Sequence, residues 1–219
     1  MTQKAKQTKR ILVVDDHPIF RSGLAGLLNQ QPDLEVCGQA DSAPLALDQM
    51  RKHRPDLAII DVSLKGTNGI ELVKLMKAEQ PKLMTLILSM HDETLYALRA
   101  LKAGALGYLM KAEAPEPVLR AVRQVLEGNL FVSPRFAEKL IFKAVSASET
   151  NAASPVDGLS DRELEVLIML GKGHSTKLVA HNLNLSIKTI ETHRAHIKEK
   201  LGLSDSNEMT RKTNAAAEG

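Results

Sequence analysis

The first 130 residues alternate short apolar runs with segments of helical spacing, and this alternation constrains the fold more than any other feature. The runs are rich in Val, Ile and Leu and have the length of buried strands. They are ILVVDD (11–16), LEVCGQ (34–39), LAIIDV (57–62), LMTLILS (83–89) and ALGYLM (105–110). Five strands alternating with five helices predict an α/β domain with a parallel five-stranded sheet. Right-handed crossovers then favour a flavodoxin-like (βα)5 arrangement.

The chain divides into four parts by composition. Residues 1–10 form a basic N-terminal tail, and residues 11–132 form the α/β domain. Residues 133–157 predict a linker that includes a helix after Ser133 and Pro134. Residues 158–219 predict a small all-α domain with a helix-turn-helix.

Composition restricts the class of protein further. Cys37 is the only cysteine, so the chain cannot form an internal disulfide or a cysteine-rich zinc site. Its place in the middle of a predicted strand indicates a small core residue. No apolar run approaches the ~20 residues of a membrane helix, and no signal-peptide core follows the basic tail. We therefore expect a cytoplasmic protein with no membrane partner.

Polar side chains follow four of the five predicted strands. Asp15 and Asp16 end the first run and Asp61 ends the third, while Ser89 and Lys111 end the fourth and fifth. In an open parallel sheet these positions meet at the carboxyl edge, where ligands bind. Three neighbouring carboxylates repel one another and raise at least one pKa, and a hard cation such as Mg²⁺ relieves the repulsion.

This set of groups suits phosphoryl transfer, which needs a carboxylate nucleophile, a metal ion and a cation on the transferring oxygens. A plain structural interpretation stays open for each residue taken alone. Asp15, Asp16 or Ser89 could simply cap the helix that follows its strand.

Four motifs resemble the receiver domain of bacterial two-component response regulators. They are VVDDHPIFR (13–21), PDLAIIDVSLKGTNGIEL (55–72), LILSMHDE (86–93) and KAGALGYLMKA (102–112). The resemblance implies that Asp61 is the phosphoacceptor and that Lys111 pairs with the phosphate. It also implies that Ser89 is the switch hydroxyl and Tyr108 the switch aromatic, for which a half-buried strand tyrosine is the alternative.

The same resemblance implies a magnesium site. Asp16 would bind Mg²⁺ directly and Asp15 partly through water, and Asp61 and the backbone carbonyl of Ser63 would complete the protein ligands. One position departs from the family: Lys65 stands where a proline is usual. We expect this difference to loosen the loop and to alter the lifetime of the acyl phosphate.

The longer helix of the helix-turn-helix has two faces, one apolar and one mainly polar. The apolar face, expected to pack on the bundle, is Ile187, Ile190, Ile197 and Leu201. The opposite face, free to enter a major groove, is Lys188, Glu191, Thr192, Ala195 and Glu199. Lys188 can reach phosphate, Thr192 and Ala195 can contact a thymine methyl, and Glu191 can accept from cytosine. An ordinary amphipathic core helix with a solvated outer face is the alternative.

Residues 159–203 resemble the LuxR-type helix-turn-helix of the NarL/FixJ group of response regulators. The matching elements are LSDRELEVL, the run GKGHSTK, LNLSIKTIETH and the closing KLGL. The resemblance implies a recognition helix from Ser186 to Leu201. The residues that it places on DNA are Ser186, Lys188, Thr189, Glu191, Thr192, His193 and Ala195.

Together, the two resemblances imply a transcriptional regulator rather than an enzyme. A sensor histidine kinase would phosphorylate Asp61, and the phosphorylated homodimer would bind paired half-sites on double-stranded DNA. The family often dimerises through the final helix of the DNA-binding domain, but here that segment, SNEMTRKTNAAAEG, is unusually polar.

Two other function classes remain open on the residues alone. A flavodoxin-like hydrolase or phosphatase could use Asp61, although the chain has neither a P-loop nor G-x-G-x-x-G. An interaction adaptor could keep the fold without phosphorylation or DNA binding. His193 and His196 could also share a metal ion, although phosphate contacts or packing suit them better because no third ligand is evident.

Overall fold

The computed structural model describes residues 8–112, 115–146 and 155–203. The chain forms two compact units, Met1–Ser133 and Pro134–Gly219, and each is considered by itself. The basic tail up to residue 7 and the polar segment after residue 203 lie outside the described residues, so the expected final helix is not tested.

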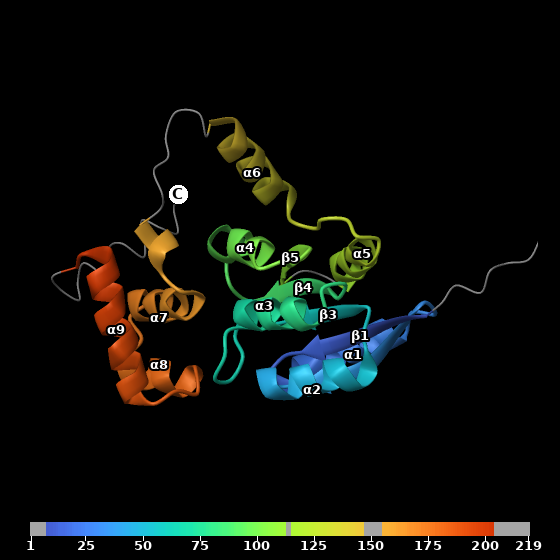
Figure 1. Cartoon of the computed structure of the whole chain (residues 1–219), viewed down its shortest axis with the longest axis horizontal. Helices are drawn as coiled ribbons and strands as arrows, with labels where there is room; N and C mark the ends of the chain where they lie inside the picture. Colours follow the sequence, from blue (N-terminus) through green and yellow to red (C-terminus); the bar gives the residue numbers. More distant parts are fainter. Residues whose placement is uncertain (1–7, 113–114, 147–154, 204–219) are drawn as a thin grey trace, which may run out of the picture. The chain divides into compact units, whose positions relative to one another are not determined.

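The first unit contains a five-stranded parallel sheet in the order β2-β1-β3-β4-β5 (Figure 1). Its strands are β1 (Lys9–Val14), β2 (Leu34–Ala40), β3 (Leu57–Ile60), β4 (Met84–Ser89) and β5 (Gly107–Met110). The order and the parallel pairing confirm the predicted flavodoxin-like (βα)5 arrangement. Because β1 and β3 are neighbours, the residues that follow them lie next to each other at the carboxyl edge.

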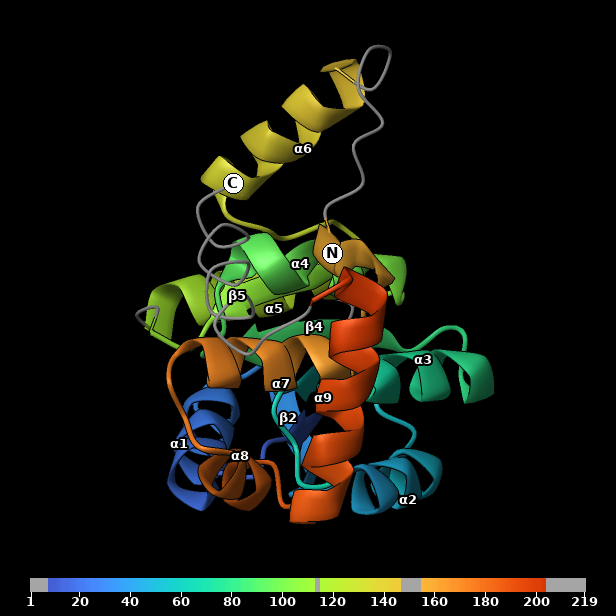
Figure 2. The same cartoon turned by 90° about the vertical axis from the view of Figure 1, so that its left-hand side faces the viewer.

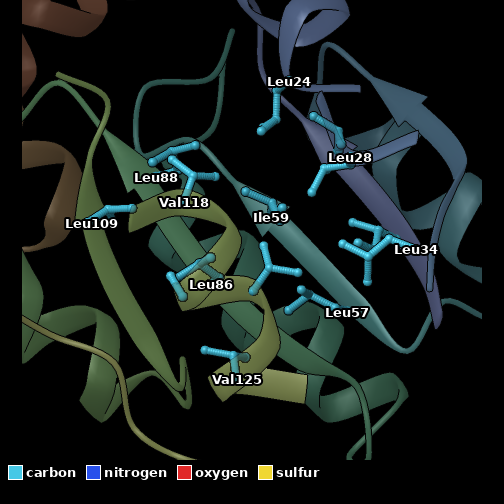
Figure 3. Close-up of a cluster of buried hydrophobic side chains, with 14 residues drawn as sticks. Leu24, Leu28, Leu34, Leu57, Ile59, Leu86, Leu88, Leu109, Val118 and Val125 are labelled. Carbon is cyan, nitrogen blue, oxygen red and sulfur yellow. The ribbon is translucent and has the colours of Figure 1, made fainter. Parts of the chain in front are cut away.

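Five helices connect and cover these strands. They are α1 (Pro18–Asn29), α2 (Ala43–His53), α3 (Gly69–Glu79), α4 (Glu93–Lys102) and α5 (Pro115–Leu126). Helices α1 and α5 pack on one face of the sheet, where their Leu and Val side chains join those of the strands in one cluster (Figure 3). Ile11 and Val13 of β1 belong to this cluster, whereas Leu12 and Val14 alternate to the other face, where they are also buried.

The second unit is entirely helical in its described part. It contains α6 (Pro134–Ser146), a 3₁₀ turn (Pro155–Gly158), α7 (Asp161–Gly171), α8 (Thr176–Asn182) and α9 (Ile187–Leu201). Helix α9 packs beside α7 and α8 (Figure 2). The short α8, the turn and the long α9 form the predicted helix-turn-helix, and α6 supplies the helix expected after Ser133.

Serine side chains begin the three helices α7, α8 and α9. Ser160 and Glu163 form the reciprocal capping box of α7, in which each side chain accepts from the other residue's backbone N–H. Ser175 caps α8 and Ser186 caps α9. Gly202 ends α9 with φ of 61°, a conformation that glycine adopts without a steric penalty.

Cys37 is partly exposed rather than fully buried in the core. It lies on the edge strand β2, beside a register irregularity between Ile11 and Leu12 of β1. Its Sγ lies 3.4 Å from the carbonyl oxygen of Ile11. An edge position leaves one side of the strand uncovered, which is the reason that the expected core placement is wrong.

None of the helices in the described ranges combines the length and the apolar character that crossing a bilayer requires.

Gly69, the first residue of α3, lies against the backbone of the loop after β3. A Cβ at this position would stand 1.9 Å from the carbonyl oxygen of Asp61, so a side chain cannot fit without moving the backbone. We expect Gly69→Ala to lower the free energy of unfolding by about 1–3 kcal/mol, as overpacking does, in urea titrations of the full chain.

Gly23→Ala is the matched control, because a Cβ on Gly23 in α1 meets nothing within 4 Å. There the same change should raise stability by about 0.5–1 kcal/mol, since alanine is the better helix former. Equal stability of the two variants would contradict the close packing around Gly69.

Candidate functional site

Lys111 joins two of the strand-end carboxylates at the carboxyl edge of the sheet. Asp15 and Asp61 follow Val14 and Ile60, which are register partners on β1 and β3. The Nζ atom of Lys111 lies 2.6 Å from Asp15 Oδ2 and 2.7 Å from Asp61 Oδ2. All three side chains are about 3–4% exposed. The fold therefore places a buried ammonium group between two buried carboxylates.

The charges of this pocket do not balance. Burial raises the pKa of Asp61 to about 6, and the neighbouring carboxylates of Asp15 and Asp16 add to the rise, while Lys111 opposes it. Lys111 is further held by the ring of Phe20, whose centroid lies 4.6 Å from Nζ. Three carboxylates against one ammonium leave a surplus of negative charge, as the strand-end pattern predicted.

Asp16 and His17 extend the acidic cluster toward solvent. His17 Nδ1 lies 2.8 Å from Asp16 Oδ1 and 3.3 Å from Asp15 Oδ1. The Oδ1 atom of Asp16 is buried, and its contact with His17 Nδ1 is an ion-pair contact that lacks hydrogen-bond geometry. Potential ligand atoms of Asp15, Asp16, His17 and Asp61 all lie within 4.8 Å of one another. Three of these residues offer carboxylate oxygens, the ligands that a hard divalent cation prefers, and His17 offers an imidazole nitrogen.

The capping alternatives are resolved by the helices themselves. The N-cap residue of α1 is His17, whose side chain makes no capping hydrogen bond. Asp15 Oδ1 accepts at 2.9 Å from the backbone N–H of His17, which lies before the first residue of the helix. Asp92, not Ser89, caps α4, because its Oδ1 accepts from Thr94 N at 2.8 Å.

His91 connects the loops that follow β3 and β4, and sequence reasoning missed it. Its Nε2 lies 2.7 Å from Ser63 Oγ, and its ring packs on Tyr96 with centroids 4.8 Å apart. Its backbone N–H donates to Ser89 Oγ at 3.2 Å. The one signal in the sequence is its place two residues after the end of β4, which is also at the carboxyl edge.

Tyr108 is fully buried in β5, so the half-buried alternative is wrong. Its hydroxyl donates to the backbone oxygen of His91 at 2.8 Å. Burial raises the pKa of Tyr108, which keeps the phenol protonated and able to donate. Ser89 is equally buried. Both candidate switch residues therefore bond to His91: Ser89 Oγ accepts from its backbone N–H, and the Tyr108 hydroxyl donates to its backbone oxygen.

The end of the first unit contacts the helix that follows this loop. Ser133 donates its backbone N–H to Glu93 Oε1 at 2.9 Å and its hydroxyl to Glu93 Oε2. Glu93 is the first residue of α4. The start of the linker is thus attached to α4 two residues after His91.

The loop that carries Ser63 is closed by Asn68 and Gly69. Asn68 is buried and caps α3 by accepting from Ile70 N at 2.9 Å, and Gly69 N donates to Val62 O at 2.7 Å. Ser63 forms an antiparallel bridge with Asn68. Lys65 is exposed in this loop and does not contribute to the pocket.

The second unit presents the predicted outer face of α9. Lys188, Glu191, Thr192, Ala195 and Glu199 are all exposed, and Ile190, Ile197 and Leu201 are buried. Ile187 is 51% exposed, so its assignment to the buried face is wrong. As the first residue of the helix, it precedes the part of α9 that its neighbours cover.

Several predicted DNA-contacting side chains already have hydrogen bonds. Ser186 Oγ accepts from Thr189 N at 3.0 Å and lies 2.8 Å from Thr189 Oγ1. Thr192 donates its hydroxyl to the carbonyl oxygen of Lys188 at 3.1 Å. His193 is partly buried, between the two faces.

Buried charges hold α9 in place, and the apolar pattern of α7 gave no sign of them. Arg162 pairs with Glu165 at 2.7 Å and donates to the carbonyl oxygen of Leu183, in the turn before α9, at 3.1 Å. Glu163 pairs with Lys200 near the end of α9 at 2.7 Å. These bonds join α7 to the turn and to the far end of α9.

The sequence also left Arg194 unassigned. Its Nη1 donates to both carboxylate oxygens of Glu191, at 3.0 and 3.2 Å, and to Thr176 Oγ1 of α8 at 3.2 Å. The metal alternative for His193 and His196 finds no support, because the single candidate metal cluster among the described residues is the one around Asp61.

Two family models match the chain, in the order of its two units. Residues 11–123 match the response regulator receiver domain, and residues 157–213 match the bacterial regulatory proteins of the luxR family.

Curated relatives cover both units. The oxygen regulatory protein NreC of Staphylococcus epidermidis is 36% identical over 205 residues, covering 91% of this chain and 94% of the relative. The response regulator GacA of Pseudomonas aeruginosa is 33% identical over 200 residues, covering 91% and 92%.

Solved structures agree with this assignment. A LuxR-family two-component response regulator from an Aurantimonas species is 34% identical, with a TM-score of 0.59, over 64% of this chain and 99% of that one. The response regulator RcsB of Salmonella enterica, bound to the promoter P1flhDC with phosphomimetic BeF₃⁻, is 26% identical. It covers 95% of this chain and 100% of that one, with a TM-score of 0.62. Because relatives match both units over nine-tenths of its length, the chain belongs to the NarL/FixJ-type two-component response regulators, which join a receiver domain to a LuxR-type DNA-binding domain.

Proposed function

We propose that Asp61 is the residue of this DNA-binding response regulator that accepts a phosphoryl group from a sensor histidine kinase. The observation that supports this most is the placement of Lys111 Nζ between Asp15 and Asp61, at 2.6 and 2.7 Å. A buried carboxylate with an ammonium group beside it has both a nucleophile and a cation for the incoming phosphoryl oxygens. The raised pKa of Asp61 also makes it a stronger nucleophile than an exposed carboxylate.

In this proposal an Asp61 carboxylate oxygen attacks phosphorus, and the bond from phosphorus to the kinase's histidine nitrogen breaks. The electron pair of that bond returns to the imidazole ring. Lys111 would then move its contact from the carboxylate to a phosphoryl oxygen. The products are an acyl phosphate on Asp61 and a neutral histidine on the kinase.

The acidic cluster fits a magnesium ion, because three of its four residues offer carboxylate oxygens and Asp16 Oδ1, in contact with His17, is shielded from water. Asp16 would hold Mg²⁺ directly, Asp15 partly through water, and Asp61 and the backbone carbonyl of Ser63 would complete the set. When bound, the ion neutralises charge on the transferring phosphoryl group.

We propose that Ser89 and Tyr108 form the switch. Ser89 would turn toward the phosphoryl group, and Tyr108 would settle in the buried position that it occupies here, with its hydroxyl on His91. The loop between them leads into α4, whose Glu93 holds Ser133 at the start of the linker. Movement of this loop would therefore reach the connection to the DNA-binding unit.

The output in this proposal is a homodimer bound to paired half-sites on double-stranded DNA in the cytoplasm. Helix α9 would enter the major groove through Ser186, Lys188, Thr189, Glu191, Thr192, His193 and Ala195. Support comes from the exposure of the outer face and from RcsB, whose structure contains a promoter and a phosphomimetic. The protein would act as a regulator, and no external phosphoester would be its substrate.

The central test is phosphorylation of the full chain with Mg²⁺ and acetyl phosphate, followed by intact mass, oligomeric state and binding to mixed DNA fragments. We expect the wild type to gain one phosphoryl group, to dimerise and to bind DNA more tightly. Asp61→Asn should do none of these, because an amide is not a nucleophile for phosphorus.

Asp56→Asn is the matched control, since Asp56 precedes β3 at the opposite edge of the sheet and contacts Arg10 and Lys9. It should be phosphorylated like the wild type. Phosphorylation of Asp61→Asn would exclude Asp61 as the acceptor. Turnover of free phosphoesters would support the hydrolase, and phosphorylation without any DNA binding would support the adaptor.

The charge surplus of the pocket predicts a pH-dependent stability. The pKa of Asp61 rises from 3.8 in the unfolded chain to about 6 in the folded chain, so the folded state favours the protonated carboxyl group. The stability that this preference contributes is fully present below pH 3.8 and is lost as pH rises through 6. Without magnesium, ionised Asp61 then costs about 3 kcal/mol of folding free energy at neutral pH. Asp61→Asn should therefore unfold at higher urea than the wild type at about pH 8 in EDTA.

This gain should shrink at about pH 5, where Asp61 is protonated, and also in millimolar Mg²⁺, which stabilises the ionised form. Asp56→Asn should show no such gain, because Asp56 is partly exposed. A gain that is independent of both pH and Mg²⁺ would mean that charge repulsion is not its cause.

A further inference from the structure

Glu191 is an acidic side chain on the face of α9 that is proposed to enter DNA. The side chain is 52% exposed, in the second turn of the helix. DNA phosphates repel an unpaired carboxylate, and removing water from that carboxylate on binding costs free energy. Without a neighbouring cation, Glu191 would therefore oppose the binding that the rest of α9 supports.

Arg194 removes this conflict. Its Nη1 lies 3.0 and 3.2 Å from the two carboxylate oxygens of Glu191. The same nitrogen lies 3.2 Å from Thr176 Oγ1, on the first turn of α8. The guanidinium group thus joins the two helices of the helix-turn-helix and fixes the carboxylate of Glu191 on one side.

The Glu191 side chain is 52% exposed and that of Arg194 is 25% exposed. Because water screens the exposed carboxylate end, we expect the pair to add little to the stability of the fold. In a major groove the same pair loses water, and its electrostatic and hydrogen-bonding effects become stronger. The pair is therefore suited to act when DNA is bound.

We propose that Arg194 is a positioning residue for DNA specificity, which holds Glu191 so that its carboxylate accepts from the N4 amino group of a cytosine in the major groove. This inference rests on the proposed docking of α9. In this inference Thr176, Arg194 and Glu191 together recognise one C·G base pair of each half-site. Arg194 acts through Glu191, and Thr176 sets the direction from which the guanidinium group approaches.

The test selects bound duplexes from a random-sequence library with the full chain, Mg²⁺ and beryllofluoride, and then sequences them. The wild type should enrich a paired motif with one cytosine position that depends on Glu191. Glu191→Gln should change the preference there from cytosine to adenine, because glutamine pairs with adenine N6 and N7. Arg194→Gln should lower the preference for cytosine at least fivefold, with other positions unchanged.

Two further variants separate position from charge. Arg194→Lys keeps the charge but loses the planar fork, so it should restore only part of the preference. Thr176→Val keeps the ion pair and removes its anchor, and it should weaken the same position alone. Arg51→Gln is the matched control, since it removes a bidentate Arg–Glu pair outside the DNA-binding unit and should leave the motif unchanged.

Four results would overturn the inference. If Arg194→Gln weakens binding to all sequences alike and lowers the salt slope by about one, Arg194 contacts phosphate. If it lowers the unfolding temperature with the motif intact, its role is structural. If the wild type enriches no sequence, the proposed docking of α9 fails and the inference fails with it, whereas an enriched motif that no variant changes rejects the inference alone.

Discussion

The carboxyl edge of the sheet depends on one buried ammonium group. Asp15 and Asp61 are forced together because they follow register partners on adjacent parallel strands, and each is almost fully removed from water. Two neighbouring buried carboxylates strongly destabilise a fold unless a cation pairs with them, and Lys111 contacts both. A single lysine does not neutralise the whole cluster, so the pKa of Asp61 stays high. The same surplus of negative charge that lowers the stability of the fold favours a hard cation, which in our proposal would offset it.

The pocket is connected to the rest of the receiver unit through the loop after β4. His91 contacts Ser63 on one side and accepts from the hydroxyl of Tyr108 on the other. A few residues later, Glu93 of α4 holds Ser133, where the linker begins. These hydrogen bonds join elements that are distant in sequence, and the two-residue backbone step from His91 to Glu93 connects them.

The DNA-binding unit is subject to a different constraint. A small bundle has only a small hydrophobic core, and this core must hold its exposed helix rigidly. Here the buried pair of Arg162 and Glu165 holds the turn before α9, and Glu163 with Lys200 holds the other end of that helix. Loss of Arg162 or Lys200 would remove an ion-pair partner from the buried carboxylate of Glu165 or Glu163, so both pairs favour this orientation of α9. The outer face is thereby free to differ in sequence without loss of the fold.

The sequence by itself determined the strand order and the meeting of Asp15, Asp61 and Lys111, because strand alternation and parallel pairing are local or topological rules. Only the tertiary structure decided the contact between Ser63 and His91 and the exposure of Ile187. It also decided the burial of charged side chains in α7 and the bridge from α9 to α8. These features depend on which side chains face one another once distant elements pack. Periodicity along one helix or strand contains no information about the element on the other side.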